Sequence, residues 1–196
     1  MKLYVCLSLS LMLFLSMPTL AQSDTKYEAG AGYSLLRENA WENRHGFVLS
    51  FTQKLNKRFG IETEVGGNYN KDIFPFSPNG SRQNDFVHSI LAGPQFKFRQ
   101  DARIQPWAHV LAGITLNNES RPIFVATQPG GPVNTVVPMP VTNVRFGFQP
   151  GGGIDFWMTP KIGIRLGVDY RRAMGNFNDR DFFRAQSGIV FRFGHQ

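Results

Sequence analysis

The chain has 196 residues, which suits a single domain, and a formal net charge of +7 from 21 Lys and Arg against 14 Asp and Glu. The basic residues are scattered without a basic run, which argues against a nucleic-acid-binding surface and favours contact with anionic lipid head groups. The single cysteine, Cys6, lies in an N-terminal apolar stretch, so the remaining chain has no disulfide and no thiol chemistry.

The first 21 residues have the pattern of a secretory signal peptide. Lys2 supplies a positive start, residues 3–15 are apolar apart from serines, and Ala21 ends a small-residue cleavage site before Gln22. The apolar stretch is short for a transmembrane helix, and no later stretch is long and apolar enough for one. The sequence therefore predicts a signal peptide over 1–21 and one domain over 22–196.

Eight later segments alternate between apolar and polar side chains with the period of a β-strand. They cover residues 27–37, 44–55, 60–70, 85–98, 104–117, 143–157, 162–171 and 186–193. Most are about 10 residues or longer, enough to cross a bilayer when tilted, whereas strands of soluble proteins are typically about 5–6 residues long. One face of each segment suits lipid and the other suits a polar lumen.

The connectors between these segments alternate in length. Residues 56–59, 99–103 and 158–160 are short, whereas 38–43, 71–84, 118–142 and 173–180 are longer. Short periplasmic turns and longer extracellular loops are typical of transmembrane barrels, and an even strand count puts both termini on the periplasmic side.

Aromatic residues near the strand ends predict two girdles at the membrane interfaces. Those expected at the periplasmic ends are Tyr27, Phe59, Phe98, Trp157 and Phe193, and those expected at the outer ends are Tyr69, Phe86, Tyr170 and Phe183.

The predicted lumen-facing side chains include equal numbers of acids and bases. They are Glu28, Glu62, Glu64, Asp155 and Asp169, with Arg145, Arg165, Arg171, Arg184 and Arg192. The interior of an eight-stranded barrel is just wide enough for side chains to fill, and buried charges must pair. This pattern favours an ion-pair network that plugs the barrel. The alternative is a narrow or gated polar path.

No group of residues indicates catalysis, a cofactor or a metal. The histidines His45, His88, His109 and His195 lack metal-ligand spacing and are interpreted as rim or lumen polar residues. His88 and Ser89 are adjacent in a strand and face opposite sides, so they form no nucleophile–base couple. Glu62 and Glu64 share a face, but pairing with lumen arginines is favoured over acid–base work. Residues 151–153 are three glycines without the Lys-Ser/Thr of a P-loop, which indicates a strand bend. We therefore predict a protein that is not an enzyme.

Two loops depart from the barrel pattern. Residues 118–142 combine five prolines with apolar residues such as Ile123, Phe124 and Val136, and residues 71–84 resemble them on a smaller scale. The longer segment predicts a mobile loop or an extended hairpin protruding beyond the membrane. Alternatively, both loops form contact surfaces for a host molecule or another surface ligand.

The last strand-length segment, residues 186–193, resembles the C-terminal signal that the barrel-assembly machinery reads in bacterial outer-membrane proteins. It begins with polar Gln186, continues through Gly188 and ends with the aromatic pair Phe191 and Phe193. With the signal peptide, the eight segments and the loop alternation, the chain resembles small OmpA/OmpX-like barrels, the porin-family outer membrane β-barrel domain. One departure is that residues 194–196 follow the terminal aromatic.

This resemblance implies an all-β fold, an eight-stranded antiparallel up-and-down transmembrane β-barrel in the bacterial outer membrane. Its expected partners are outer-membrane lipids including lipopolysaccharide, the barrel-assembly machinery and a surface ligand at loops 71–84 and 118–142. The expected function is a structural or surface-interaction role in envelope integrity, adhesion or resistance. The alternatives are a small-solute channel, a lipid A-modifying enzyme and a soluble lipocalin-like binder, although the charged lumen disfavours an apolar ligand.

Overall fold

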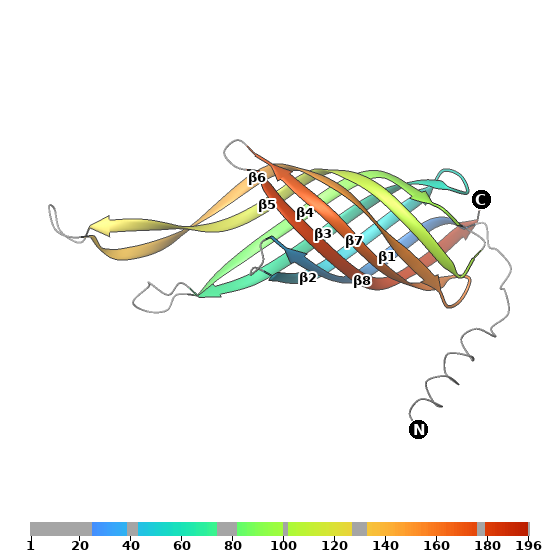
Figure 1. Cartoon of the computed structure of the whole chain (residues 1–196), viewed down its shortest axis with the longest axis horizontal. Helices are drawn as coiled ribbons and strands as arrows, with labels where there is room; N and C mark the ends of the chain where they lie inside the picture. The colour runs from blue at the N-terminus through green and yellow to red at the C-terminus, as the bar shows by residue number, and fades with distance from the viewer. Residues whose placement is uncertain are drawn as a thin grey trace, which may run out of the picture.

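The computed structural model describes residues 25–38, 43–73, 82–99, 102–126, 133–175 and 179–195 (Figure 1). The predicted signal peptide, residues 1–21, and most of the predicted loop tips lie outside these residues. Within the described part of the chain, no helix is long and apolar enough to span a bilayer.

Eight strands form one closed antiparallel barrel in sequence order, so the predicted fold class is confirmed. The strands are β1 (Thr25–Arg37), β2 (Asn43–Lys54), β3 (Phe59–Ile73), β4 (Arg82–Lys97), β5 (Ile104–Ala126), β6 (Val133–Trp157), β7 (Ile162–Met174) and β8 (Arg180–His195). The start of β1, the end of β8 and the three short turns lie at one end (Figure 1). This is the periplasmic end in barrels of this kind, and we call the opposite end the outer end.

Barrel closure depends on a close approach of β1 and β8. Gly32 lies opposite Gly188, and Tyr27 lies opposite Phe193 at the periplasmic end. A Cβ added to Gly32 would lie 2.4 Å from the backbone oxygen of Ser187, and one added to Gly188 would lie 2.4 Å from that of Ala31. Only glycine fits this contact, which explains the small residues at the seam.

Side-chain alternation separates an apolar exterior from a polar interior in every strand. In β7, inward Arg165 and Arg171 are buried, while outward Leu166 and Val168 are 55% and 68% exposed. Large apolar side chains exposed around the barrel include Leu49, Phe51, Ile61, Val65, Ile90, Val110, Ile114, Phe146 and Phe191. A continuous apolar exterior around a charged interior is the arrangement of a membrane-spanning barrel.

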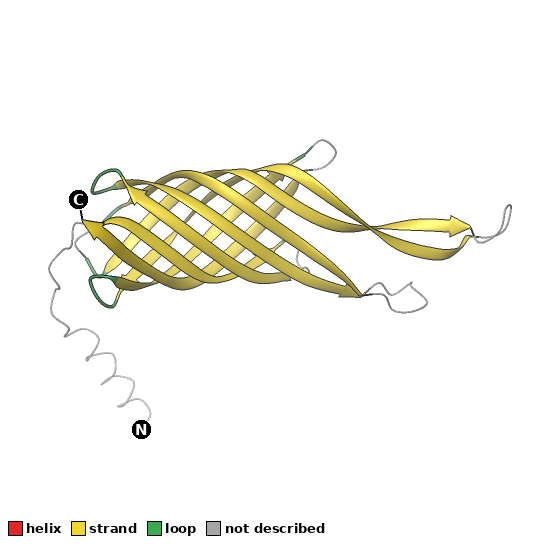
Figure 2. Cartoon of the chain, turned by 180° about the vertical axis from the view of Figure 1, so that it is seen from behind, coloured by secondary structure: helices red, strands yellow, loops and turns green. Residues whose placement is uncertain are grey.

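Strands β5 and β6 extend well past the barrel as a two-stranded ribbon (Figures 1 and 2). They pair with each other as far as Ala126 and Val133, whereas β4 pairs with β5 only up to Asn118 and β7 pairs with β6 only from Phe146 onward. The prediction that these strands stop at 117 and start at 143 was therefore wrong. The extended-hairpin alternative is confirmed for residues 118–126 and 133–142, and residues 127–132 lie outside the described residues. The prolines that suggested a loop are compatible with this ladder.

The described prolines of the ribbon, Pro122, Pro138 and Pro140, lie where their missing N–H groups remove no hydrogen bond between β5 and β6. Pro122 faces Pro138, and Ser120 faces Pro140. Because proline has no N–H, Pro122 and Pro138 face each other at positions that exchange no ladder hydrogen bonds. Pro140 is two residues from Pro138 and therefore also lies at a position that exchanges no hydrogen bond with β5. Their nitrogens face the outer edges of the ribbon. These edges consequently offer fewer donors to a further strand, which protects the ribbon from edge-to-edge pairing.

Trp157 corrects one part of the predicted periplasmic girdle. Its side chain is only 6% exposed and points into the lumen, whereas Phe59, Phe98 and Phe193 are exposed on the outside as predicted. Side chains two residues apart in a strand lie on the same face, and Trp157 is two residues from inward-facing Asp155, so its side chain also points inward.

Candidate functional site: the barrel interior

Near the periplasmic end, the carboxylate of Glu28 contacts four cationic side chains. Glu28 on β1 forms ion pairs with Lys54 (3.0 Å), Arg192 (2.9 Å) and Arg165 (3.6 Å), and Lys97 Nζ also donates to it. These partners come from β2, β8, β7 and β4, so a single carboxylate links strands on several sides of the barrel.

A second carboxylate, Asp155 on β6, shares two of those cations. Arg165 Nε donates to Asp155 Oδ1 (2.7 Å), Arg165 Nη2 donates to Asp155 Oδ2 (2.9 Å), and Lys97 Nζ lies 3.1 Å from Asp155 Oδ2. Two parallel bonds from one guanidinium are the geometry of a strong Arg–carboxylate pair. Glu28 and Asp155 with their partners therefore form one connected cluster.

The middle of the lumen is bridged by a histidine. His109 Nδ1 lies 2.7 Å from Glu62 Oε2, and His109 Nε2 lies 2.9 Å from Asp169 Oδ1. A neutral imidazole carries one N–H, so two such bonds require an extra proton on the cluster, either on the ring or on a carboxyl group. Gln95 Nε2 donates to Glu62 (2.9 Å) and completes this layer.

The outer layer of charges centres on Arg184. Its Nη1 and Nη2 donate to the two oxygens of Glu64 (2.6 Å each), and its Nε donates to Asp169 (2.8 Å). Arg171 Nε donates to Gln149 (2.6 Å), while its Nη2 lies 3.6 Å from Glu64. Asp169 is shared with His109, so the charged layers join into one network through the barrel.

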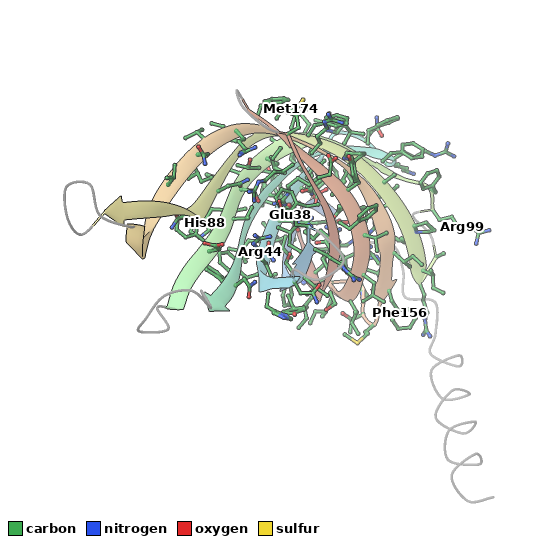
Figure 3. All side chains as sticks on the ribbon, turned by 60° about the vertical axis from the view of Figure 1, so that its left-hand side comes forward. Glu38, Arg44, His88, Arg99, Phe156 and Met174 are labelled. Carbon is green, nitrogen blue, oxygen red and sulfur yellow. The ribbon has the colours of Figure 1, made fainter. Side chains whose placement is uncertain are left out.

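Both ends of this network are covered. At the outer end, a buried apolar cluster of Leu36, Val87, Ala173 and Phe182 lies inside the barrel. At the periplasmic end, the guanidinium of Arg192 lies 3.4 Å from the ring centroid of Trp157, a cation–π contact. Above the apolar cluster, Glu38 pairs with Arg44 (2.8 Å; both labelled in Figure 3) and with Arg180 (3.0 Å).

The ion-pair prediction for the interior is confirmed. All ten predicted lumen charges have inward parity, and Glu62 and Glu64 are paired with His109 and Arg184. Sequence reasoning missed Lys97 as a lumen cation. It lies between outward Phe96 and Phe98, so alternation alone would have placed it inside. The bridge made by His109 had no sequence signal, since its partners lie on β3 and β7.

The remaining candidate residues do not come together. His45 and His88 face the lipid side, while Ser89 is buried inside, so the predicted separation of His88 and Ser89 is confirmed. The side chain of His195 lies outside the described residues. Among the described residues, no group of His, Cys, Asp and Glu has the arrangement of a metal site.

Solved structures with the same architecture identify the class of fold. The attachment invasion locus protein Ail of Yersinia pestis, in complex with the heparin analogue sucrose octasulfate, aligns over 88% of this chain and 100% of its own, with 14% identity and a TM-score of 0.54. Neisserial surface protein A aligns over 85% and 96%, with 14% identity and a TM-score of 0.56. OprG, an outer membrane protein of Pseudomonas aeruginosa, aligns over 90% and 99%, with 8% identity and a TM-score of 0.55.

At such low identities, these likenesses show the fold. No protein-family model and no curated protein matches the sequence. The chain is a small eight-stranded β-barrel with the fold of these outer-membrane proteins, and its apolar exterior is that of a transmembrane barrel. Barrels with this architecture and exterior lie in bacterial outer membranes, so lipid surrounds the protein.

Proposed function

We propose that the protein has a structural or surface-interaction role in the outer membrane, in envelope integrity, adhesion or resistance, and that it acts through its outer end rather than as an enzyme or an open channel. The observation that carries this proposal is the continuous network of paired charges inside the barrel. A lumen whose charges are largely paired with one another offers little to a solute, which leaves the outer segments as the surface for interaction.

The small size of one cavity beside the lumen agrees with this proposal. A cavity at the β1–β8 seam, lined in part by Gly30, Gly32, Ser50 and Arg165, has a volume of about 10 Å³. That is room for about one water molecule. A solute path would require several of the long arginine side chains to move together and leave their carboxylates.

The ribbon of β5 and β6 is the best-developed surface for interaction. It pairs only with itself beyond the barrel, and its proline positions keep its edges from adding strands. Two of the structural neighbours are described as an attachment invasion protein and a surface protein, which agrees with a role at the cell surface. We also propose that residues 1–21 are removed as a signal peptide and that the barrel-assembly machinery inserts the rest.

The proposal is tested in the bacterium that makes the protein. A strain lacking the chain is compared with strains carrying the full chain or a ribbonless chain, in which an Asn-Gly turn joins residues 118 and 142. We expect the full chain to restore adhesion to immobilised heparin or survival in detergent, and the ribbonless chain to fail. Full restoration by a folded ribbonless chain would contradict a role for the ribbon.

A second measurement addresses the channel alternative. In planar lipid bilayers, the purified full chain should show no ion conductance above background. Steady single-channel currents from the unmodified protein would contradict the proposed surface role and support a transport role.

A further inference from the structure

The three short turns at the periplasmic end are strongly basic. They are residues 55–58 between β2 and β3, residues 98–103 between β4 and β5, and residues 158–161 between β6 and β7. Five cations against one acid, Asp101, give the turns a net charge of +4, and Asp101 lies outside the described residues. Four of the cations have exposed side chains, and we call them the periplasmic rim: Lys57, Arg58, Arg99 and Lys161 (Arg99 is labelled in Figure 3).

Two members of the rim are held by the same turn geometry. Asn56 Oδ1 accepts hydrogen bonds from the backbone N–H groups of Arg58 and of the next residue (2.9 Å each). In the same way, Thr159 Oγ1 accepts from the N–H groups of Lys161 (3.3 Å) and of the next residue (2.9 Å). A side-chain oxygen that bonds to the backbone a few residues on fixes a turn. Arg58 and Lys161 therefore project from equivalent, fixed positions in two turns.

Both of these cations lie around the mouth of the lumen. The strand ladders continue into the turns, because Lys97 N donates to Arg58 O (2.8 Å) and Arg192 N donates to Lys161 O (2.8 Å). Directly opposite residues of a ladder place their side chains on the same face, and Lys97 and Arg192 both contact Glu28 inside the lumen. Arg58 and Lys161 are therefore on the lumen side of the barrel end.

The rim has no ionic partner within the described part of the chain. None of its four side chains takes part in an ion pair or a side-chain hydrogen bond with another described residue. By contrast, Lys54 and Lys97, which border the same turns, both contact Glu28. The buried carboxylates near this end, Glu28 and Asp155, are already shared among the lumen cations. The positive charge of the rim is therefore left for a partner outside the chain.

The rim faces the periplasm, while other residues at the same height face the lipid. On the outer side of the barrel end the exposed side chains are apolar, with Phe59 49%, Phe98 58% and Ile162 36% exposed. Aromatic and aliphatic groups at this height take up the contact with the bilayer interface. A ligand for Arg58 and Lys161 therefore approaches along the barrel axis, from the periplasm.

The arrangement of the rim suits an extended polyanion. Neighbouring turns are two strands apart, about 10 Å along the rim at a strand spacing of about 4.8 Å, so the cations are spread around the mouth. Charged residues are depleted from the apolar core of protein–protein interfaces, which disfavours a folded protein partner at this surface. A polymer with carboxylates at intervals can contact several of the cations at once, and each contact favours the next.

We propose that the periplasmic rim binds carboxylates on the peptide stems of the bacterial cell wall, the carboxylate-rich polymer of the compartment that this end faces. This contact ties the barrel to the wall at the end opposite to the ribbon. The proposal goes beyond the surface role and fails separately from it, because the ribbonless chain keeps the rim and rim variants keep the ribbon.

The test measures co-sedimentation of the purified full chain, in uncharged detergent micelles, with purified cell-wall sacculi. R58Q/K161Q should bind about threefold more weakly than wild type, and adding K57Q and R99Q should bring the loss to about tenfold, since each exposed ion pair contributes modestly. R58K/K161R keeps both charges and should bind as wild type does. The matched control R37Q/R172Q removes two exposed cations from the outer end and should also bind as wild type does.

Chemical controls identify the anion. Sacculi with amidated carboxylates should bind wild type about tenfold more weakly, the loss expected for the four-residue variant. Soluble polyglutamate should displace the protein from untreated sacculi, and phosphatidylglycerol added to the micelles at the same charge concentration should displace less of it.

Three results would overturn the proposal. The first is that the folded four-residue variant, verified by heat-modifiable migration, binds sacculi as well as wild type does. The second is that R37Q/R172Q loses as much binding as R58Q/K161Q, which would mean that net charge alone matters. The third is that phosphatidylglycerol displaces the protein as well as polyglutamate does, because the rim would then bind lipid head groups.

Discussion

The barrel interior and the β5–β6 ribbon are built on opposite principles. In the interior, each acidic side chain contacts cations or amides from several strands, and Glu28 alone gathers partners from four of them. In the ribbon, two strands pair only with each other, and prolines keep their edges from further pairing. Stability therefore resides in the interior, while the ribbon is free to change without loss of the barrel.

The largest expected effect is the loss of Arg184. Arg184→Leu leaves Glu64 and Asp169 buried without their main cation, and breaking one side of a buried ion pair typically costs about 3–5 kcal/mol. Urea unfolding in lipid vesicles, followed by tryptophan fluorescence, measures the change. The double variant R184L/E64L should recover part of the loss, because it removes the stranded charge as well. Equal stabilities of R184L and wild type would show that the network contributes little.

A smaller loss is expected at the bridge in the middle of the lumen. His109→Gln removes a group that bonds to both Glu62 and Asp169, and an amide can replace only part of that geometry. The expected destabilisation is about 1–3 kcal/mol, the cost of leaving a buried polar group unsatisfied. The same urea titration applies. A more stable H109Q protein would mean that the histidine serves something other than the cohesion of the network.

Most of the architecture could be predicted from alternation, because lipid outside and polar groups inside impose a period of two on every strand. That rule also places Lys97 and Trp157 in the lumen, yet the attraction of aromatics to membrane interfaces led to the wrong side for Trp157. Alternation fails for the ribbon, whose strands have no lumen to face. Facing prolines such as Pro122 and Pro138 look like loop residues in a sequence, although their register makes them acceptable in a ladder.

The bridge formed by His109 illustrates a different limit. Glu62 and Asp169 are 47 and 60 residues from it in sequence, and they meet it only because the barrel closes and brings β3, β5 and β7 around one lumen. Sequence alternation gives the side that a residue faces. It does not give the height in the barrel at which two inward side chains meet, because that depends on the stagger between strands.

The surface pair Arg172–Asp179 provides a contrast to the interior. The guanidinium donates to Asp179 at 2.8 Å and holds the pKa of that carboxyl below its usual range, but both side chains are largely exposed. Exposed ion pairs contribute little to stability because water screens them. Arg172→Ala should therefore leave the urea midpoint unchanged while NMR titration shows the pKa of Asp179 rising. A clear loss of stability in Arg172→Ala would show that the Arg172–Asp179 pair stabilises the fold, as the buried ion pairs do.

A small effect on stability is also expected from the most drastic change, removal of the ribbon. In the ribbonless chain, β5 and β6 still pair up to Asn118 and Thr142, and every ion pair from Glu28 to Arg184 stays intact. An Asn-Gly turn suits a two-residue connection between such strands. The free energy of unfolding should stay within about 0.5 kcal/mol of wild type, the usual range for surface changes. Urea titration and heat-modifiable migration measure this directly. A loss comparable to that of Arg184→Leu would mean that the ribbon is part of the folded core, because its pairing would then hold the wall of the barrel closed.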